Sequence, residues 1–156
     1  MALDKLSNLY RQVILDHAQH PRNQRKLESY SYQMELLNPT CGDAIVVQCL
    51  LDGSEEDDTT VVKQVAFDGY GCSISIASAS MMTEVLIGKK LSRALEIVQA
   101  FNQLISSTDT ISETDEEVLK DAFSLAGLKQ FPSRYKCGIL AWKAFEMGAI
   151  ERNEEK

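Results

Sequence analysis

The chain has 156 residues, of which 44% are hydrophobic and 25% are charged, and its formal net charge is −7 at pH 7. Acidic residues outnumber basic ones by 23 to 16, which argues against a binding surface for nucleic acid or for anionic membranes. No apolar run approaches the roughly 20 residues of a membrane span, and the opening segment MALDKLSNLYRQ is too polar for a secretory signal. We therefore expect a single cytoplasmic domain over residues 1–156, with reduced thiols and a core built without disulfides.

The first half of the chain predicts one helix followed by a small sheet. Apolar residues recur at helical spacing over residues 3–18, and the His20-Pro21 step that follows ends this helix. The Asp52-Gly53 pair is a hairpin signal, and the acidic run after it, at 54–58, is typical of a solvated loop. Three segments have strand character: residues 30–37, 44–51 and 59–67. Together they indicate a three-stranded antiparallel sheet.

The second half is predicted to be helical in four segments: residues 73–87, 92–105, about 115–126 and 132–150. Ser and Ala dominate the first of these segments, so we expect that helix to pack unusually close to the sheet. Gly127 suits the end of the third helix, and Pro132 suits the first turn of the fourth. The polar stretch 106–118 is expected to form an exposed connection, and residues 151–156 a solvated tail.

Several side chains are predicted to serve the core or the surface rather than a functional site. Cys49 alternates with Ile45 and Val47 on one face of its strand, so we expect it to be buried in the core. His17 is expected on the helix surface and His20 on a loop, which argues against a histidine-based catalytic dyad. The last helix carries a predicted buried stripe: Trp142, Phe145 and Ile150.

Three of the four cysteines stand beside a glycine in a turn-forming context: Cys41, Cys72 and Cys137. A structural cysteine usually packs among apolar neighbours, whereas a glycine lets the backbone turn sharply and lets another group approach closely. Asp43 follows Cys41 by two residues and adds a carboxylate. This set of donors predicts one tetrahedral metal site, with unrelated structural cysteines as the alternative. Because no C-x-x-C pair is present, the tertiary fold must assemble the site, and a thiol–disulfide oxidoreductase is disfavoured.

The surroundings of two of the three thiols, Cys72 and Cys137, favour their ionised form. Cys72 is expected at a helix N-terminus, where free N–H groups stabilise a thiolate. Arg134 and Lys136 lie just before Cys137, and their positive charges act in the same direction. Three thiolates and a carboxylate suit Zn²⁺, and iron–sulfur chemistry is also compatible with them. A carboxylate exchanges more readily than a fourth thiolate, so this donor set favours reactivity over a purely structural role.

Three ordered motifs resemble those of the U-type iron–sulfur cluster assembly proteins, the IscU/SufU/NifU N-terminal family. They are Asn-Pro-Thr-Cys-Gly-Asp at 38–43, the segment 69–82 that begins Gly-Tyr-Gly-Cys-Ser, and Arg-Tyr-Lys-Cys at 134–137. The resemblance covers about residues 3–150. It implies an α+β fold in which a three-stranded antiparallel sheet carries helices mainly on one face. It also implies a set of metal-site residues: Cys41, Asp43, Cys72 and Cys137.

Two departures from the scaffold branch of this family favour the SufU-like branch. Lys136 stands where the scaffold branch has histidine, and LKQFPSRYK at 128–136 does not reproduce its Leu-Pro-Pro-Val-Lys chaperone-recognition motif. The resemblance therefore implies zinc-dependent sulfur transfer, in which Cys41 takes persulfide sulfur from a PLP-dependent cysteine desulfurase of the SufS type. The sulfur would pass to downstream cluster-assembly proteins. Two alternatives stay open: a scaffold that assembles a [2Fe–2S] cluster on the same residues, and a zinc-stabilised adaptor without sulfur chemistry.

Overall fold

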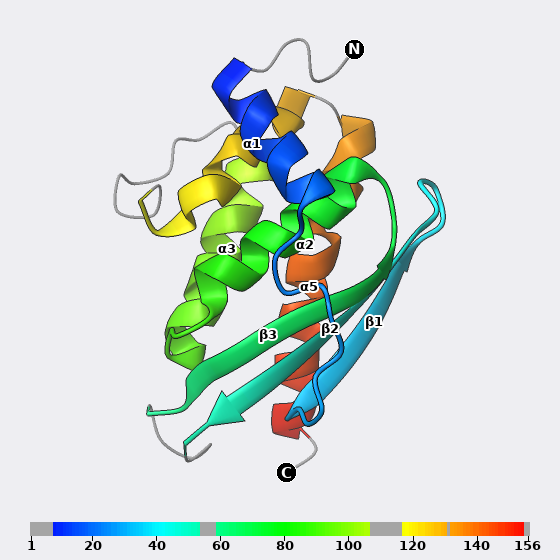
Figure 1. The fold of residues 1–156 in the computed structure, drawn as a ribbon. Coiled ribbons are helices and arrows are strands. Elements are labelled where there is room, and N and C mark those ends of the chain that lie inside the picture. The colour runs from blue at the N-terminus through cyan, green and yellow to red at the C-terminus, as the bar shows by residue number, and fades with distance from the viewer. Residues whose placement is uncertain (1–7, 54–58, 107–116, 131, 155–156) are drawn as a thin grey trace.

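A three-stranded antiparallel sheet forms one layer of the protein, as the strand pattern predicts (Figure 1). The structure is a computed structural model that describes residues 8–53, 59–106, 117–130 and 132–154. Its strands are β1 (Tyr32–Asn38), β2 (Asp43–Asp52) and β3 (Val61–Tyr70), and β2 lies in the centre. Asn38 pairs with Asp43 across the β1–β2 turn. The central strand therefore begins at the end of the sheet where this turn lies.

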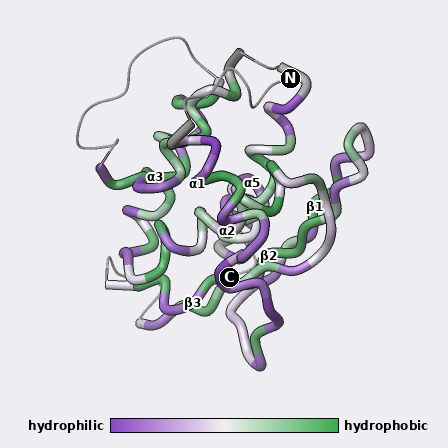
Figure 2. Tube along the Cα trace, turned by 45° about the horizontal axis from the view of Figure 1, so that its top comes forward, coloured by the Kyte–Doolittle hydropathy of each residue, from purple (hydrophilic) through white to green (hydrophobic). Residues whose placement is uncertain are grey.

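The helices gather mainly on one face of the sheet, which confirms the expected α+β architecture (Figure 1). α5 packs against β1 and β2, whereas α1 packs on α2 and on the 3₁₀ helix η2. In Figure 2, hydrophobic stretches of the strands and of α3 alternate with hydrophilic ones, as expected for elements that bury one side. The helices are α1 (Asn8–Gln19), α2 (Ser73–Leu86), α3 (Leu91–Ser106), η2 (Lys120–Gln130) and α5 (Pro132–Glu154).

α2 is buried along most of its length and lies among the other helices. Its small residues allow this close packing. The sequence predicts that they approach the sheet, but the closest contacts are with α5. Ser78 Oγ donates to the Gly138 carbonyl at 2.5 Å and accepts a hydrogen bond from Trp142 Nε1 at 2.9 Å. The small residues of α2 thus let this helix pack against α5 and α1 more extensively than against the sheet. Trp142 also stacks on Phe101, with ring centroids 3.9 Å apart.

The C-terminal part of the chain is more helical than predicted. α5 continues to Glu154, so residues 151–154 belong to a helix, and Arg152 Nε donates to the Ser31 carbonyl at 3.2 Å. Ile150 is 48% exposed, so the prediction that it completes a buried stripe is wrong, whereas Phe145 is buried as expected. η2 continues past Gly127 because the next residue, Leu128, is anchored in the core.

Some predicted segments fall outside the described residues: the start of the first helix, the acidic run at 54–58 and most of the connection at 106–118. None of the helices in the described ranges combines the length and the apolar character that a bilayer crossing requires.

Candidate metal centre

Cys41 lies in the turn that joins β1 to β2. Gly42 adopts a left-handed conformation with φ of +73°, which a glycine accepts without strain, and Cys41 N–H donates to the Asn38 carbonyl at 3.2 Å. The Cys41 side chain is partly exposed, whereas Asp43, the first residue of β2, is buried. The turn therefore presents a thiol at the surface directly beside a buried carboxylate.

Cys72 occupies the N-cap position of α2, at the helix N-terminus as predicted, just after the end of β3. Its backbone N–H donates to Asp43 Oδ1 at 2.8 Å. A Cβ atom on Gly71 would lie 2.7 Å from the same oxygen, so only glycine lets the chain pass this close to the carboxylate. Cys72 Sγ lies 3.5 Å from Ser75 Oγ, one turn along the helix.

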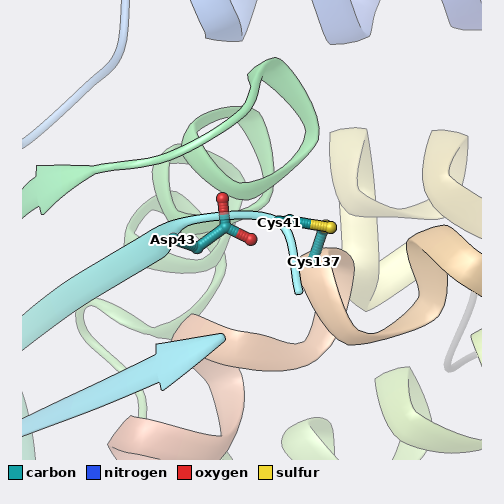
Figure 3. A group of neighbouring side chains, drawn as sticks. All are labelled: Cys41, Asp43 and Cys137. Carbon is teal, nitrogen blue, oxygen red and sulfur yellow. The ribbon is translucent and has the colours of Figure 1, made fainter. Parts of the chain in front are cut away.

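Cys137 completes the cluster from the beginning of α5. It is buried, and its Sγ lies 3.0 Å from Cys41 Sγ (Figure 3). One donor atom each from Cys41, Asp43 and Cys137 lies within 4.8 Å of the other two. The structure thus brings three of the four predicted site residues into one group. Cys72 borders this group through its N–H bond to Asp43, and all four cysteines of the chain are free thiols.

The electrostatics of the cluster differ for its acid and its buried thiol. Burial opposes ionisation of Asp43, but hydrogen bonds from the Cys72 N–H, Ser75, Cys137 and Asn38 outweigh it and hold the pKa of Asp43 below its ordinary value. The prediction that Arg134 and Lys136 favour the Cys137 thiolate is wrong for the metal-free protein, because burial, together with contacts with Cys41, Cys72 and Asp43, raises the pKa of the Cys137 thiol. At neutral pH the cluster thus holds a fixed carboxylate beside a thiol that ionises when a cation binds.

Two buried polar residues that support the cluster were not predicted as site residues. Asn38 Nδ2 donates to Asp43 Oδ2 at 3.3 Å and lies 3.7 Å from Cys137 Sγ. Ser75 contacts both Cys72 and Asp43. Two sequence signals point to these residues. Asn38 is a polar residue at the end of a strand, just before the Cys41 turn, and Ser75 follows the N-cap residue Cys72 by three positions. Arg134 and Lys136 are exposed.

Two residues predicted to lie outside the metal site, Cys49 and His17, have opposite outcomes. Cys49 is buried in the core as predicted, and burial raises the pKa of its thiol to about 12. His17 was expected on the helix surface, and this is wrong, because the side chain is fully buried. Its imidazole lies between Ser80 of α2 and Asp121 of η2, on the same buried face of α1 as Ile14, whereas the polar residues Asp16 and Gln19 are exposed.

Comparison with known proteins identifies the family. The family model described as the NifU-like N terminal domain matches residues 9–138. The chain is 42% identical over 146 residues to the zinc-dependent sulfurtransferase SufU of Bacillus subtilis (strain 168), covering 94% of this chain and 92% of that protein. It is 38% identical over 153 residues to the iron–sulfur cluster assembly scaffold protein IscU of Streptococcus pyogenes serotype M1, covering 98% and 89%.

A solved structure gives the same result. A candidate iron–sulfur cluster assembly scaffold protein for the SUF system, from Fervidobacterium islandicum AW-1, superimposes with a TM-score of 0.76 at 31% identity, over 91% of this chain and 98% of that one. An N-terminal NifU-like protein from Brucella abortus has the same fold, with a TM-score of 0.74 at 18% identity. The family model, the full-length relatives and the shared fold agree, and the chain belongs to the NifU-like N-terminal domain family.

Proposed function

We propose that this protein acts in iron–sulfur cluster biogenesis as a zinc-dependent sulfur acceptor, which takes sulfur onto Cys41 from the persulfide of a PLP-dependent cysteine desulfurase. The observation that carries the proposal is the convergence of donor atoms from Cys41, Asp43 and Cys137 within 4.8 Å. The activity in the name of the Bacillus subtilis relative, a zinc-dependent sulfurtransferase, supports this type of reaction.

The donor set fits zinc. Sulfur and carboxylate oxygen are common ligands of this ion, and Asp43 is ionised and oriented by its hydrogen bonds, so it supplies charge without rearrangement. Cys41, Asp43 and Cys137 would hold the ion, and Cys72 at the adjoining helix N-terminus would supply the fourth ligand. Bound there, zinc would keep the coordinating thiols deprotonated at neutral pH.

Cys41 is the thiol best placed to receive sulfur. It is partly exposed on a turn that Gly42 shapes, whereas Cys137 is buried in α5. The Cys41 thiolate attacks the terminal sulfur of the partner's persulfide, and a new S–S bond forms between the two sulfurs. The partner's S–S bond breaks, its cysteine leaves as a thiolate, and Cys41 retains the terminal sulfur as its own persulfide.

The first prediction is that Cys41→Ala abolishes sulfur acceptance and stimulation of the desulfurase while the fold survives. The matched control is Cys49→Ala, which removes a buried thiol far from the turn and should accept sulfur as the wild type does. The measurement is the gain of one sulfur mass after incubation with a desulfurase and cysteine. If Cys41→Ala still carries labelled sulfur normally, Cys41 is not the acceptor.

A second candidate function is that of a scaffold on which a [2Fe–2S] cluster is assembled. Three thiols beside one another are compatible with cluster ligation, and the Streptococcus pyogenes relative is named as such a scaffold. Anaerobic reconstitution with iron and sulfide separates the two functions. A stable cluster at one per chain, seen in the visible spectrum, favours the scaffold, and zinc retention without a stable cluster favours sulfur transfer.

A further inference from the structure

A second group of metal-ligating side chains lies away from the cysteines, where three helical elements meet. His17 of α1 places its Nε2 at 2.9 Å from Asp121 Oδ2 of η2 and at 3.7 Å from Glu84 Oε1 of α2. One donor atom from each of the three residues lies within 4.8 Å of the other two. Glu84 follows Cys72 by twelve residues, which corresponds to about 18 Å along α2. This group is therefore separate from the thiol centre.

The buried imidazole is held in an orientation suited to a metal ligand. His17 Nδ1 lies 2.8 Å from Ser80 Oγ, and the Arg22 N–H donates to the same oxygen at 2.8 Å. Ser80 Oγ has two lone pairs, so it can accept both bonds at once, one of them from Nδ1–H. Nε2 faces the carboxylates of Glu84 and Asp121, which can only accept, so in the metal-free protein an Nε2–H donates to Asp121, and the ion would take the place of that proton. A metal-binding histidine commonly has its other ring nitrogen fixed by such a partner.

The space and the charge around the group also suit a cation. Glu84 and Asp121 line a pocket of about 410 Å³, together with Asn23 and Lys120, so water has access to the carboxylates. Arg22 is paired with Asp16 at 2.6 Å, and its charge also attracts Glu84 and Asp121. The three carboxylates of Asp16, Glu84 and Asp121 outnumber the two cationic groups of Arg22 and Lys120. The remaining negative charge suits a divalent ion.

We propose that His17, Glu84 and Asp121 form a second metal site, one that binds Zn²⁺ through one imidazole nitrogen and two carboxylate oxygens. Such ligands are usual for this ion, and three protein ligands leave a coordination position open toward the pocket. Binding displaces the Nε2 proton to solvent when that nitrogen carries one. The ion would join α1, α2 and η2, which the sequence places far apart.

The test uses the full-length protein with its thiol centre already filled by one equivalent of zinc. Calorimetric titration with further Zn²⁺ should show a second bound equivalent. The variants Glu84→Gln and Asp121→Asn remove one ligand each, and since these side chains are 46% and 56% exposed, the fold should tolerate the change. Each should weaken binding of the second equivalent about 10-fold or more. The control, Glu96→Gln, changes an exposed carboxylate on α3 and should leave the affinity for the second equivalent of zinc unchanged.

A second readout identifies the imidazole directly. The chain has two histidines, so its imidazole ¹⁵N spectrum is simple. When the second zinc equivalent binds, the His17 Nε2 resonance should shift, the remaining ring proton should reside on Nδ1, and His20 should be unaffected. The proposal is overturned if no second equivalent binds, if Glu84→Gln and Asp121→Asn bind it as the wild type does, or if His20 responds in place of His17.

Discussion

The Asp43 carboxylate is fixed in place by the protein's own hydrogen bonds. The Cys72 N–H binds its Oδ1 at 2.8 Å, and Asn38 Nδ2 binds its Oδ2 at 3.3 Å. These bonds orient the acid beside Cys41 and Cys137 at no further cost when an ion arrives. An amide of the same shape can still accept the bond from Cys72 but lacks the negative charge.

Asp43→Asn should therefore weaken zinc binding about 10-fold or more. It should also lower the stability of the zinc-free protein modestly, because the new amide nitrogen cannot accept the bond from Asn38 Nδ2. Asp52→Asn, which changes an exposed acid at the far end of β2, is the control and should bind zinc normally. Competition with a chromophoric chelator measures both affinities. Equal zinc affinity in Asp43→Asn and the wild type would show that Asp43 is not a ligand.

At the residue scale, sequence reasoning found groups whose chemistry is unusual and missed groups whose role depends on their neighbours. Cys41, Asp43 and Cys137 stand out by residue type beside glycine, and the fold brings them together. Asn38 is an ordinary polar residue until the turn brings it beside Asp43. The prediction for His17 is wrong because the residue type suggests the surface, whereas its place three residues after Ile14 puts it on the buried face of α1, where α2 and η2 supply polar partners.

At the scale of elements, the ends of the strands position the site. Gly69 near the end of β3 has a φ of +122°, and a Cβ atom there would lie 2.0 Å from the Ala44 carbonyl oxygen of β2. Gly88 after α2 also has a positive φ, of +88°, but a Cβ atom there meets no atom within 4 Å. Both glycines have a backbone conformation that would strain any other residue, but only Gly69 lacks room for a side chain.

Gly88→Ala should lower the free energy of unfolding by about 1–2 kcal/mol, the cost of placing a side chain in the left-handed region. Gly69→Ala should cost about 1–3 kcal/mol more, because its Cβ overlaps the backbone of β2. Urea unfolding of both variants measures the difference. Equal losses of stability would contradict the close approach of β2 and β3 at this position.

Predicting the elements succeeded where local chemistry determines them. Alternation and the Asp52-Gly53 turn predicted the strands β2 and β3, and Pro132 marks the start of α5 as expected. Element ends were harder to predict. α5 runs past Ile150 because its last turns pack along β1, where Arg152 reaches the Ser31 carbonyl, and this contact has no local sequence signal.

At the scale of the whole molecule, the thiol centre joins parts of the chain that lie far apart in sequence. Cys41 belongs to the β1–β2 turn, Cys72 to the N-terminus of α2 and Cys137 to α5. A ligand that binds only the folded state stabilises it, so metal binding here should be coupled to global stability.

Removal of zinc should therefore lower the unfolding temperature, and zinc at about 100 times its Kd should add about 2.7 kcal/mol to the free energy of unfolding. Cys137→Ala should abolish most of this gain. Cys49→Ala should retain the gain from zinc, although loss of a buried side chain lowers the stability of the core. Thermal unfolding with and without a chelator measures the effect. An unfolding temperature that does not respond to zinc would contradict the coupling.

X-ray absorption at the zinc edge tests most directly whether one ion joins these segments, in protein loaded with a single equivalent of the metal. We expect three sulfur neighbours at about 2.3 Å and one oxygen at about 2.0–2.2 Å. One sulfur should disappear from the shell in Cys41→Ala and one in Cys72→Ala. A shell of nitrogen and oxygen alone, or a wild-type spectrum unchanged by either substitution, would contradict this expectation.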